Sequence, residues 1–429
     1  MRILTFTCAV LLVSTTAFAD VVVPIEAVSS RVVVRAAPTS ESADPGSRFP
    51  GDPVELLGSV PNWYRVRLAN GIEGFVSKRW TDVIAAEATT FTIDVVDVGT
   101  GLGVLVRGED FTLIYDGGSN DDLARGDDKR MFAYLRAVAP ELTTIDHIVL
   151  SHTHRDHVEL LPDLVAEYDV RHVWDSGRLN DICGYRAFLD AVLDEPDVEY
   201  HSAMQDFGTR EYAFEAKLCY GENLPPAVLE IPHASRITEF PVALGQGAAM
   251  TFLYADGAPH TSPNENSVAV RLDVGGTRIL FMVDAEAGGR QPPSTPPSPG
   301  SIEGALLACC TTELAADILI VGHHGSRTSS RQAFLDAVDA DTFIVSSGPM
   351  RYGSVILPDA DVIAELESRG EVFRTDLDDE ACRVNPAKIG PDAEDKAGGC
   401  DNIRIIISST GRRRSSTGSK ATIRTIRAT

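Results

Sequence analysis

The most constraining feature of the sequence is a short histidine-rich turn between an apolar run and an amphipathic segment. Residues 145–150 read as a buried strand, and residues 158–168 have the spacing of a helix. The turn between them carries, in order, His152, His154, Asp156 and His157. A strand-to-helix turn brings these side chains together, and imidazole with carboxylate is a ligand set suited to zinc. The turn therefore predicts a metal site rather than a solvated loop.

Three other histidines, His147, His172 and His201, are isolated in the sequence. None of them belongs to a short-spaced pattern of ligand-type residues. We expect them to be hydrogen-bonded core or surface histidines without a role in chemistry.

The charge balance limits the partners of the chain. Its 38 Lys and Arg stand against 62 Asp and Glu, which gives a formal net charge of −24. Clustered basic residues attract a phosphate backbone, so a chain this acidic is a poor non-specific nucleic-acid binder. Nucleic acid is therefore expected as a substrate only, and this would require a local basic patch or a metal.

Residues 1–19 have the pattern of a secretory signal peptide. Arg2 precedes an apolar run over residues 3–13, and Ala17-Phe18-Ala19 provides a small-x-small cleavage site. The apolar run is too short to span a bilayer, and no other stretch reaches the roughly 18 apolar residues that a membrane span needs. The sequence predicts an exported protein, periplasmic or extracellular, with no membrane span.

Six cysteines follow this segment, and an even number in an exported chain suggests disulfides. We favour pairing Cys183 with Cys219 and Cys382 with Cys400, because each pair flanks a loop-like segment. Cys309 and its neighbour Cys310 form either a strained vicinal bridge or two buried thiols.

The segment from residue 20 to residue 86 consists of short apolar runs separated by turn residues, which predicts a small all-β barrel. The order Val34-Arg35-x-x-Pro38, Trp63-x-x-Val66 and Gly71-x-x-Gly74-Phe75-Val76 resembles bacterial SH3-like domains. Phe75 stands where that family usually has Trp, and we expect it to fill an aromatic core position. The resemblance implies binding of a cell-wall peptide or another partner, and a spacer role is the alternative.

The histidine-rich turn resembles the signature of the metallo-β-lactamase fold, and further segments resemble its ComEC-type branch, named after a bacterial DNA-uptake channel. These segments are residues 94–101, 114–118, 264–268 (Asn-Glu-Asn-Ser-Val) and 320–326 (Ile-Val-Gly-His-His-Gly-Ser). The resemblance spans residues 91–402 and implies an α/β fold, an αββα sandwich with the metal at the rim between two sheets. The expected domains are the signal peptide over residues 1–19, the SH3-like domain over 20–86 and the hydrolase domain over 91–429.

The resemblance also implies a ligand set for two zinc ions. One ion would be held by His152, His154 and a third histidine, the other by Asp156, His157 and a late histidine, with Asp284 as the bridge. The late histidine is His324, with His323 as the alternative or as an outer-shell group. The third histidine is His260, with His233 as a rival.

Two zinc ions roughly 3.5–4 Å apart would share a water and lower its pKa toward about 7, so that a metal-bridged hydroxide attacks a phosphorus or a carbonyl carbon. Asp156 is expected to orient the hydroxide, and His323, Ser326 or Arg327 to donate to the developing oxyanion. The leading hypothesis is thus an exported zinc-dependent hydrolase of a small-molecule or polymeric ester, a phosphodiesterase or nuclease.

Two alternatives remain open. The same scaffold supports amide, lactone and β-lactam hydrolysis. A non-catalytic cell-envelope binding protein is the third hypothesis, although the complete ligand set argues against it.

Two further segments have two interpretations each. The proline-rich stretch within residues 286–308 is either a lid over the site or an exposed loop. The basic C-terminal region is either a tail that grips a polyanion or a β-hairpin of residues 403–408 and 421–426.

Overall fold

The computed structural model describes residues 21–25, 27–28, 30–48, 54–68, 71–84, 88–122, 130–204, 208–238, 240–377, 402–410 and 420–426. The expected signal peptide and the expected Cys382–Cys400 pair lie outside these residues.

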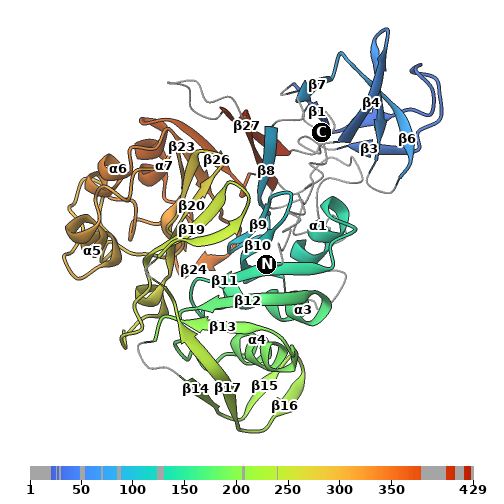
Figure 1. Cartoon of the computed structure of the whole chain (residues 1–429). Coiled ribbons are helices and arrows are strands. Elements are labelled where there is room, and N and C mark those ends of the chain that lie inside the picture. The colour runs from blue at the N-terminus through green and yellow to red at the C-terminus, as the bar shows by residue number, and fades with distance from the viewer. Residues whose placement is uncertain are drawn as a thin grey trace, which may run out of the picture.

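The N-terminal strands form a sheet of their own with the order β6-β5-β4-β1-β7, beside the two-stranded β2-β3 pair (Figure 1). The strands are β1 (Val21–Pro24), β2 (Val32–Val34), β3 (Gly46–Arg48), β4 (Val54–Val60), β5 (Trp63–Arg67), β6 (Glu73–Ser77) and β7 (Thr81–Ile84). Their core is aliphatic, and Val22, Val34, Val66 and Val76 are fully buried. Phe75 is only half-buried and lies outside this core, so the expectation of an aromatic core position was wrong.

The remaining strands form two large sheets. The ten-stranded sheet has the order β14-β17-β13-β12-β11-β10-β9-β8-β27-β28, and the seven-stranded sheet has the order β18-β19-β20-β21-β22-β23-β26. The strands of the first sheet are β8 (Ala88–Val95), β9 (Gly103–Arg107), β10 (Thr112–Gly117), β11 (Thr144–Leu150), β12 (Asp169–Asp175), β13 (Glu199–Ser202), β14 (Gly208–Phe214), β17 (Ala227–Arg236), β27 (Asn402–Thr410) and β28 (Lys420–Ile426). The second contains β18 (Val242–Gly245), β19 (Ala248–Tyr254), β20 (Ala269–Val274), β21 (Thr277–Phe281), β22 (Ile318–Ile320), β23 (Thr342–Val345) and β26 (Glu371–Arg374).

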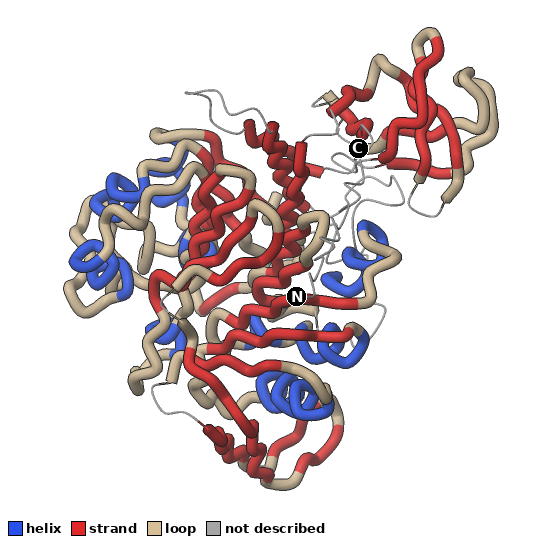
Figure 2. Tube along the Cα trace, viewed as in Figure 1, coloured by secondary structure: helices blue, strands red, loops and turns tan. Residues whose placement is uncertain are grey.

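Helices cover the outer face of each sheet, as Figures 1 and 2 show. The first sheet is covered by α1 (Arg130–Val138), α3 (Leu161–Glu167) and α4 (Cys183–Asp194), and the second by α5 (Ile302–Cys309), α6 (Gln332–Val338) and α7 (Ala360–Glu367). Shorter elements are α2 (Arg155–Val158), η2 (Pro263–Asn266), η3 (Gly322–Gly325) and the hairpins β15 (Lys217–Cys219)–β16 (Glu222–Leu224) and β24 (Arg351–Tyr352)–β25 (Val355–Ile356). The predicted αββα sandwich is confirmed.

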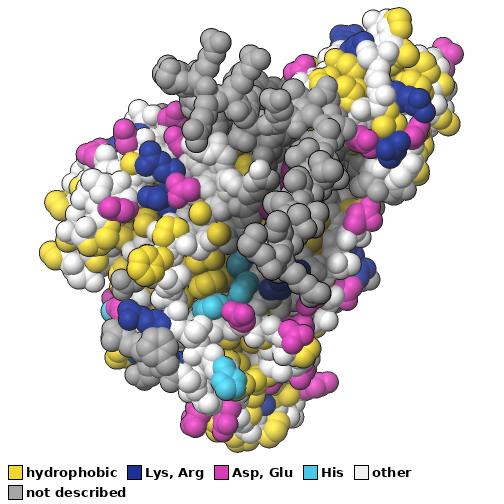
Figure 3. All heavy atoms as spheres, in the orientation of Figure 1, with side chains coloured by type: hydrophobic (Ala, Val, Ile, Leu, Met, Phe, Trp, Pro, Cys, Tyr) yellow, Lys and Arg dark blue, Asp and Glu magenta, His cyan; other side chains and the backbone are white. Residues whose placement is uncertain are grey.

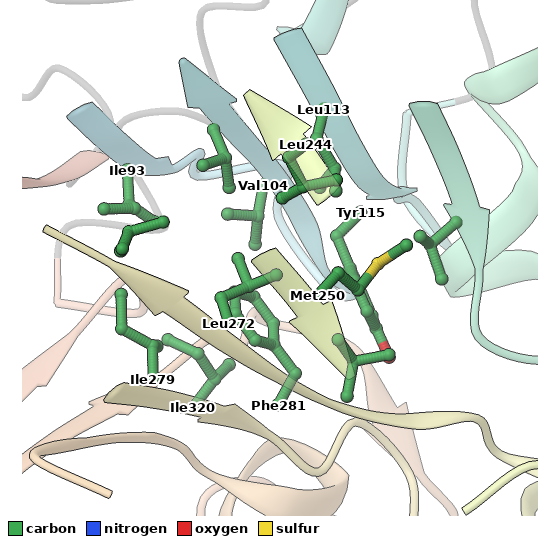
Figure 4. Close-up of a cluster of buried hydrophobic side chains, with 14 of the residues drawn as sticks. Ile93, Val104, Leu113, Tyr115, Leu244, Met250, Leu272, Ile279, Phe281 and Ile320 are labelled. Carbon is green, nitrogen blue, oxygen red and sulfur yellow. The ribbon is translucent and has the colours of Figure 1, made fainter. Parts of the chain in front are cut away.

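The two sheets pack face to face through a continuous apolar layer (Figure 4). Strand alternation sends Leu113 and Tyr115 of β10 into this layer and Ile114 toward the helices on the other face. The ring of Tyr115 stacks on that of Phe281 across the interface at 4.8 Å. This double burial explains why β10 reads as a continuous apolar run.

The C-terminal segment forms the predicted hairpin, in which Ile403 pairs with Thr425. Strand β27 also pairs antiparallel with β8, so the last part of the chain completes the sheet that residue 88 begins. Strand β8 starts at Ala88, three residues before the expected domain boundary.

Two disulfides are present in the described residues. Cys183 and Cys219 are joined, which confirms that prediction and ties α4 to β15. Cys309 and Cys310 form a vicinal bridge at the end of α5.

The proline-rich stretch packs around the start of α6. The Arg331 side chain donates to the carbonyl oxygens of Gly289, Gln291 and Pro292, which fixes this stretch on the protein surface. Of residues 286–308, only Arg290 lines the cavity at the rim between the sheets. The stretch is therefore a packed surface loop rather than a lid.

The buried carboxyl of Glu303 makes stability depend on pH. Burial raises its pKa to about 8. The carboxyl accepts hydrogen bonds from the backbone N–H groups of Ser330 and Arg331, and these bonds only partly oppose the shift. The folded state retains a proton that the unfolded chain, with a carboxyl pKa near 4.5, releases. The contribution of Glu303 to the free energy of unfolding is therefore complete below pH 4.5 and is lost as pH rises to about 8. The loss amounts to roughly 3–5 kcal/mol.

Glu303→Gln should remove this loss, because the amide does not ionise. Urea unfolding of both proteins at about pH 5 and about pH 8 measures it. An identical pH dependence in wild type and variant would show that Glu303 ionises freely in the folded protein.

Candidate metal centre

Ligand-type side chains from both sheets meet at one rim of the sandwich. His152 and His154 follow β11, and Asp284 follows β21. His323 and His324 lie in η3, directly after the neighbouring parallel strand β22. The carboxyl ends of parallel strands meet at one edge of a sheet, which is where sites form in such folds.

The donor atoms at this rim form two groups, and Asp284 belongs to one of them and faces the other. One consists of His152, His154 and Asp284, the other of Asp156, His157 and His324, and the donor atoms within each group lie within 4.8 Å of one another. Asp284 lies between the groups, with Oδ2 at 3.6 Å from His152 Nε2 and Oδ1 at 3.3 Å and 3.4 Å from the Nε2 atoms of His157 and His324.

The donor set fits a metal ion. Among the described residues, His157 Nε2, His324 Nε2 and Asp284 Oδ1 are buried without a hydrogen-bond partner, although they face one another. Unpaired buried polar atoms are costly, and imidazole nitrogens beside a carboxylate oxygen are the ligands that zinc prefers. These residues could therefore hold a divalent ion.

The pKa shifts of His152, His154 and Asp284 also suit a metal, whereas His157 differs. Burial lowers the pKa of His157, but Asp284 and Asp116 outweigh burial and raise that pKa. Burial lowers the pKa of His152 and of His154, so both rings are neutral near pH 7 and have a lone pair to offer. Burial raises the pKa of Asp284, but His157, His323 and His324 outweigh it and hold that pKa well below its usual range.

Asp116, at the end of β10, orients two of these histidines from behind. It accepts from His157 Nδ1 at 2.8 Å and from the hydroxyl of Ser151 at 2.7 Å. Ser151 Oγ in turn accepts from His152 Nδ1 at 3.1 Å. Carboxylates of this kind fix the ring and the tautomer of a ligand histidine. Sequence reasoning missed this role, although Asp116 stands in one of the motifs used above.

The η3 turn separates the two neighbouring histidines. Both residues have positive φ, 46° for His323 and 52° for His324, and their side chains make different contacts. His324 donates from Nδ1 to Ser346 O at 2.8 Å, which leaves Nε2 facing Asp284. His323 contacts Glu286 and Thr328 through Nδ1 at 3.1 Å and 2.6 Å, with Nε2 3.7 Å from Asp284 Oδ2.

Val283 stands directly before Asp284 and has an unusual backbone conformation. Its φ is 48°, which costs a β-branched residue energy. Its buried side chain belongs to the layer between the sheets. This packing compensates for the unfavourable backbone, and Asp284 keeps its place.

The structure does not bring His260 or His233 into the cluster. His260 is exposed, and its Nε2 lies 2.9 Å from Asp256 Oδ2 in the loop after β19. His233 is exposed on β17. Asn264, which stands near His260 in the sequence, instead reaches the site, with Nδ2 3.4 Å from His323 Nε2 and its Oδ1 buried without a hydrogen bond.

A cavity of about 560 Å³ opens beside this cluster. Two of its lining residues, Arg155 and Arg290, are cationic. Tyr352 of β24 also lines it and donates to Asp156 Oδ2 at 3.1 Å, while Asn120 donates to the Tyr352 hydroxyl at 3.0 Å. No sequence pattern pointed to Tyr352 or Asn120, which are distant from the histidines along the chain.

Comparison with protein families supports this reading of the fold. Residues 96–348, more than half of the chain, match the family model described as the metallo-beta-lactamase superfamily. The chain belongs to the metallo-β-lactamase superfamily. It is thus a member of a superfamily of hydrolases whose proteins typically bind metal ions. Residues 30–82 match the model of the bacterial SH3 domain.

Two curated relatives place this superfamily member near the ComEC-type branch. Recombination protein 2 of Haemophilus influenzae is 24% identical over 259 residues, which cover 60% of this chain and 24% of the relative. Competence protein ComA of Neisseria gonorrhoeae is 24% identical over 282 residues, which cover 65% of this chain and 29% of the relative. The chain thus spans about a quarter of the length of these relatives.

Among solved structures, the metallo-beta-lactamase fold protein YhfI from Bacillus subtilis matches with a TM-score of 0.34 and 15% identity, over 66% of this chain and 97% of that one. No helix in the described part of this metallo-β-lactamase-superfamily chain is both long and apolar enough to cross a membrane.

Proposed function

We propose that this chain is an exported, zinc-dependent phosphodiesterase, with nucleic acid among its candidate substrates. The observation that carries the proposal is the pair of arginines, Arg155 and Arg290, in a cavity that also contains metal-ligand side chains. A cationic wall beside a metal centre suits an anionic ester better than a neutral one.

In this proposal, His152, His154 and Asp284 would hold one zinc ion, while Asp156, His157 and His324 would hold a second with Asp284 as the shared ligand. Bound zinc would supply Lewis-acid activation of the ester and of a water nucleophile. His260 is not part of the proposed set, because its side chain pairs with Asp256 outside both groups.

The chain's own side chains would position the reactants and carry protons. Asp156 receives a hydrogen bond from Tyr352, which fixes the carboxylate that we propose orients the nucleophile. Burial lowers the pKa of His323, but Asp284 and Glu286 outweigh it and raise that pKa above its ordinary value. A protonated His323 at the cavity wall can donate to a developing negative charge on the substrate.

Arg155 and Arg290 would bind the phosphate. Arg290 is fixed by Asp359, whose oxygens lie 2.6 Å and 2.8 Å from its Nη2. Arg155 has a 42% exposed side chain, and its ion-pair contact with Glu159 Oε2 is long, at 3.7 Å. Its guanidinium is therefore the freer of the two cations to pair with a substrate.

The relatives' names favour the same substrate class. One is named for recombination and the other for competence. Both names fit chemistry on nucleic acid, whose backbone is a phosphodiester. Export rests on the N-terminal sequence pattern and on the bacterial SH3 domain, which suggests association with the cell envelope. Detection of the mature chain in a periplasmic or culture-medium fraction tests this part.

Arg155→Ala should separate phosphodiesters from carbonyl substrates. We expect KM for a chromogenic phosphodiester to rise about tenfold or more, because one charge-assisted contact of roughly 1.5–3 kcal/mol is lost. Turnover of a neutral chromogenic ester, lactone or β-lactam by the zinc-loaded chain should not change with this substitution.

His260→Ala is the matched control, since it removes a nearby histidine outside both donor groups. Its zinc content and its kcat should equal those of the wild-type chain. Hydrolysis of carbonyl substrates alone, with no turnover of phosphodiester or single-stranded DNA, would reject the phosphodiesterase proposal.

A further inference from the structure

A second cluster of ligand-type side chains lies on β12 and β13, away from the residues of the metal centre. The parallel register pairs His172 with Glu199 and Trp174 with His201. Side chains two residues apart share a face of a strand, so these four side chains lie on one face. Trp174 belongs to the layer between the sheets, which identifies this as the inner face of the ten-stranded sheet.

The donor atoms of this cluster form a triangle. His172 Nδ1 lies 3.3 Å from His201 Nε2, and Glu199 Oε2 lies 3.5 Å and 3.9 Å from these two nitrogens. Tetrahedral zinc with bonds of about 2.0–2.1 Å separates its ligand atoms by about 3.3–3.4 Å. Donor separations at the metal centre described above, 3.3 Å to 3.6 Å around Asp284, are similar.

Neighbouring side chains hold both imidazoles in this orientation. The His201 ring stacks on Trp174 at 3.8 Å, and the His172 ring stacks on His147 at 4.9 Å. His201 Nδ1 is 2.6 Å from Ser235 Oγ of the next strand, β17. With Nδ1–H donated to Ser235, the lone pair of His201 Nε2 faces the centre of the triangle, as in ligand histidines with an outer-shell partner.

Charge and access also fit an ion. Burial lowers the pKa of His201 to about 4, with a further contribution from His172, so this ring is neutral at pH 7. The side chains of His172, His201 and Glu199 are 31%, 14% and 68% exposed. The cluster is therefore open to solvent on the Glu199 side and closed on the side of Trp174. Figure 3 shows acidic side chains among basic and apolar ones on one face of the molecule, and the formal net charge of −24 favours the approach of cations.

We propose that His172, Glu199 and His201 bind one divalent ion of the zinc class, at a site that shares no residue with the metal centre. Two imidazoles and a carboxylate are a sufficient protein ligand set for zinc, with a fourth position left for water. The ion would join β12 to β13, two interior strands of the ten-stranded sheet. Its expected role is to hold these two strands together rather than to take part in hydrolysis.

Zinc stoichiometry of the full chain tests the site without reference to activity. After dialysis against a zinc buffer, His172→Ala and Glu199→Gln should each bind one zinc fewer than the wild-type chain. Glu199 is exposed, so its substitution leaves the fold intact. Asp284→Ala should lose zinc from the metal centre but retain this ion. His233→Ala, an exposed histidine on β17, is the matched control and should leave the zinc content unchanged.

Trp174 provides a second readout, because its ring stacks on the ligand His201. Titration of the Asp284→Ala chain with Cu²⁺ should quench its fluorescence, and Trp174→Phe identifies the part of the signal that belongs to this residue. Adding His172→Ala to the Asp284→Ala chain should raise the Cu²⁺ concentration needed for half-maximal quenching at least tenfold. Unchanged zinc content in both His172→Ala and Glu199→Gln would overturn the proposal, as would equal quenching with and without His172.

Discussion

Asp284→Ala is expected to abolish hydrolysis and to remove zinc from the metal centre. The carboxylate faces histidines of both donor groups, with its two oxygens 3.3–3.6 Å from His157, His324 and His152. Loss of a metal ion that supplies several kcal/mol of transition-state stabilisation lowers kcat/KM by about a thousandfold or more. Zinc content and turnover of a phosphodiester, measured on the same preparation, check both effects.

Asp256→Ala is the matched control for this substitution. It removes a carboxylate that also pairs with a histidine, His260, but outside both donor groups. We expect near wild-type turnover and a normal zinc content at the metal centre. An Asp284→Ala chain that retained both ions and its activity would refute the shared-ligand arrangement.

Of the substitutions proposed here, Arg404→Met should lower the free energy of unfolding most. Arg404 on β27 and Asp94 on β8 are fully buried, with Nε 2.5 Å from one carboxylate oxygen and Nη2 3.1 Å from the other. The substitution leaves Asp94 as an uncompensated charge in the sheet that joins the last part of the chain to the first strand of the sandwich. Breaking such a buried pair costs about 3–5 kcal/mol of unfolding free energy.

The double variant Asp94→Leu/Arg404→Met separates the charge effect from a packing effect. Replacing both partners by apolar side chains removes the unpaired charge, so most of the lost stability should return. Urea unfolding of the single and the double variants measures this difference. A double variant as unstable as Arg404→Met would mean that packing around Arg404, rather than the ion pair, supports the hairpin.

The local part of the metal centre could be read from the sequence because it lies within one turn. His152, His154, Asp156 and His157 are close in space for the same reason that they are close along the chain. Asp284 and His324 came from resemblance to family motifs, and the structure brings both to this turn. The third histidine was the weakest of these inferences, since the favoured His260 had a rival in His233.

The outer parts of the site depend on contacts that no pattern encodes. Asp116 reaches His157 because β10 and β11 are neighbouring parallel strands, and Tyr352 reaches Asp156 from a hairpin almost two hundred residues away. Such positions follow from strand order and loop packing. No motif or spacing in the sequence links Asp156 to Tyr352, so their contact could not be predicted.

The sequence by itself therefore determined the four ligand-type residues of one turn, because short spacing is a local property. Its resemblance to family motifs implied the αββα class and the hydrolase superfamily. Tertiary structure brought His324, the favoured residue of the two neighbours, into a donor group, and it left His260 outside. It also joined His172 to His201, two histidines that look isolated along the chain. The physical reason is strand register, which brings residues together across a sheet regardless of their separation in sequence.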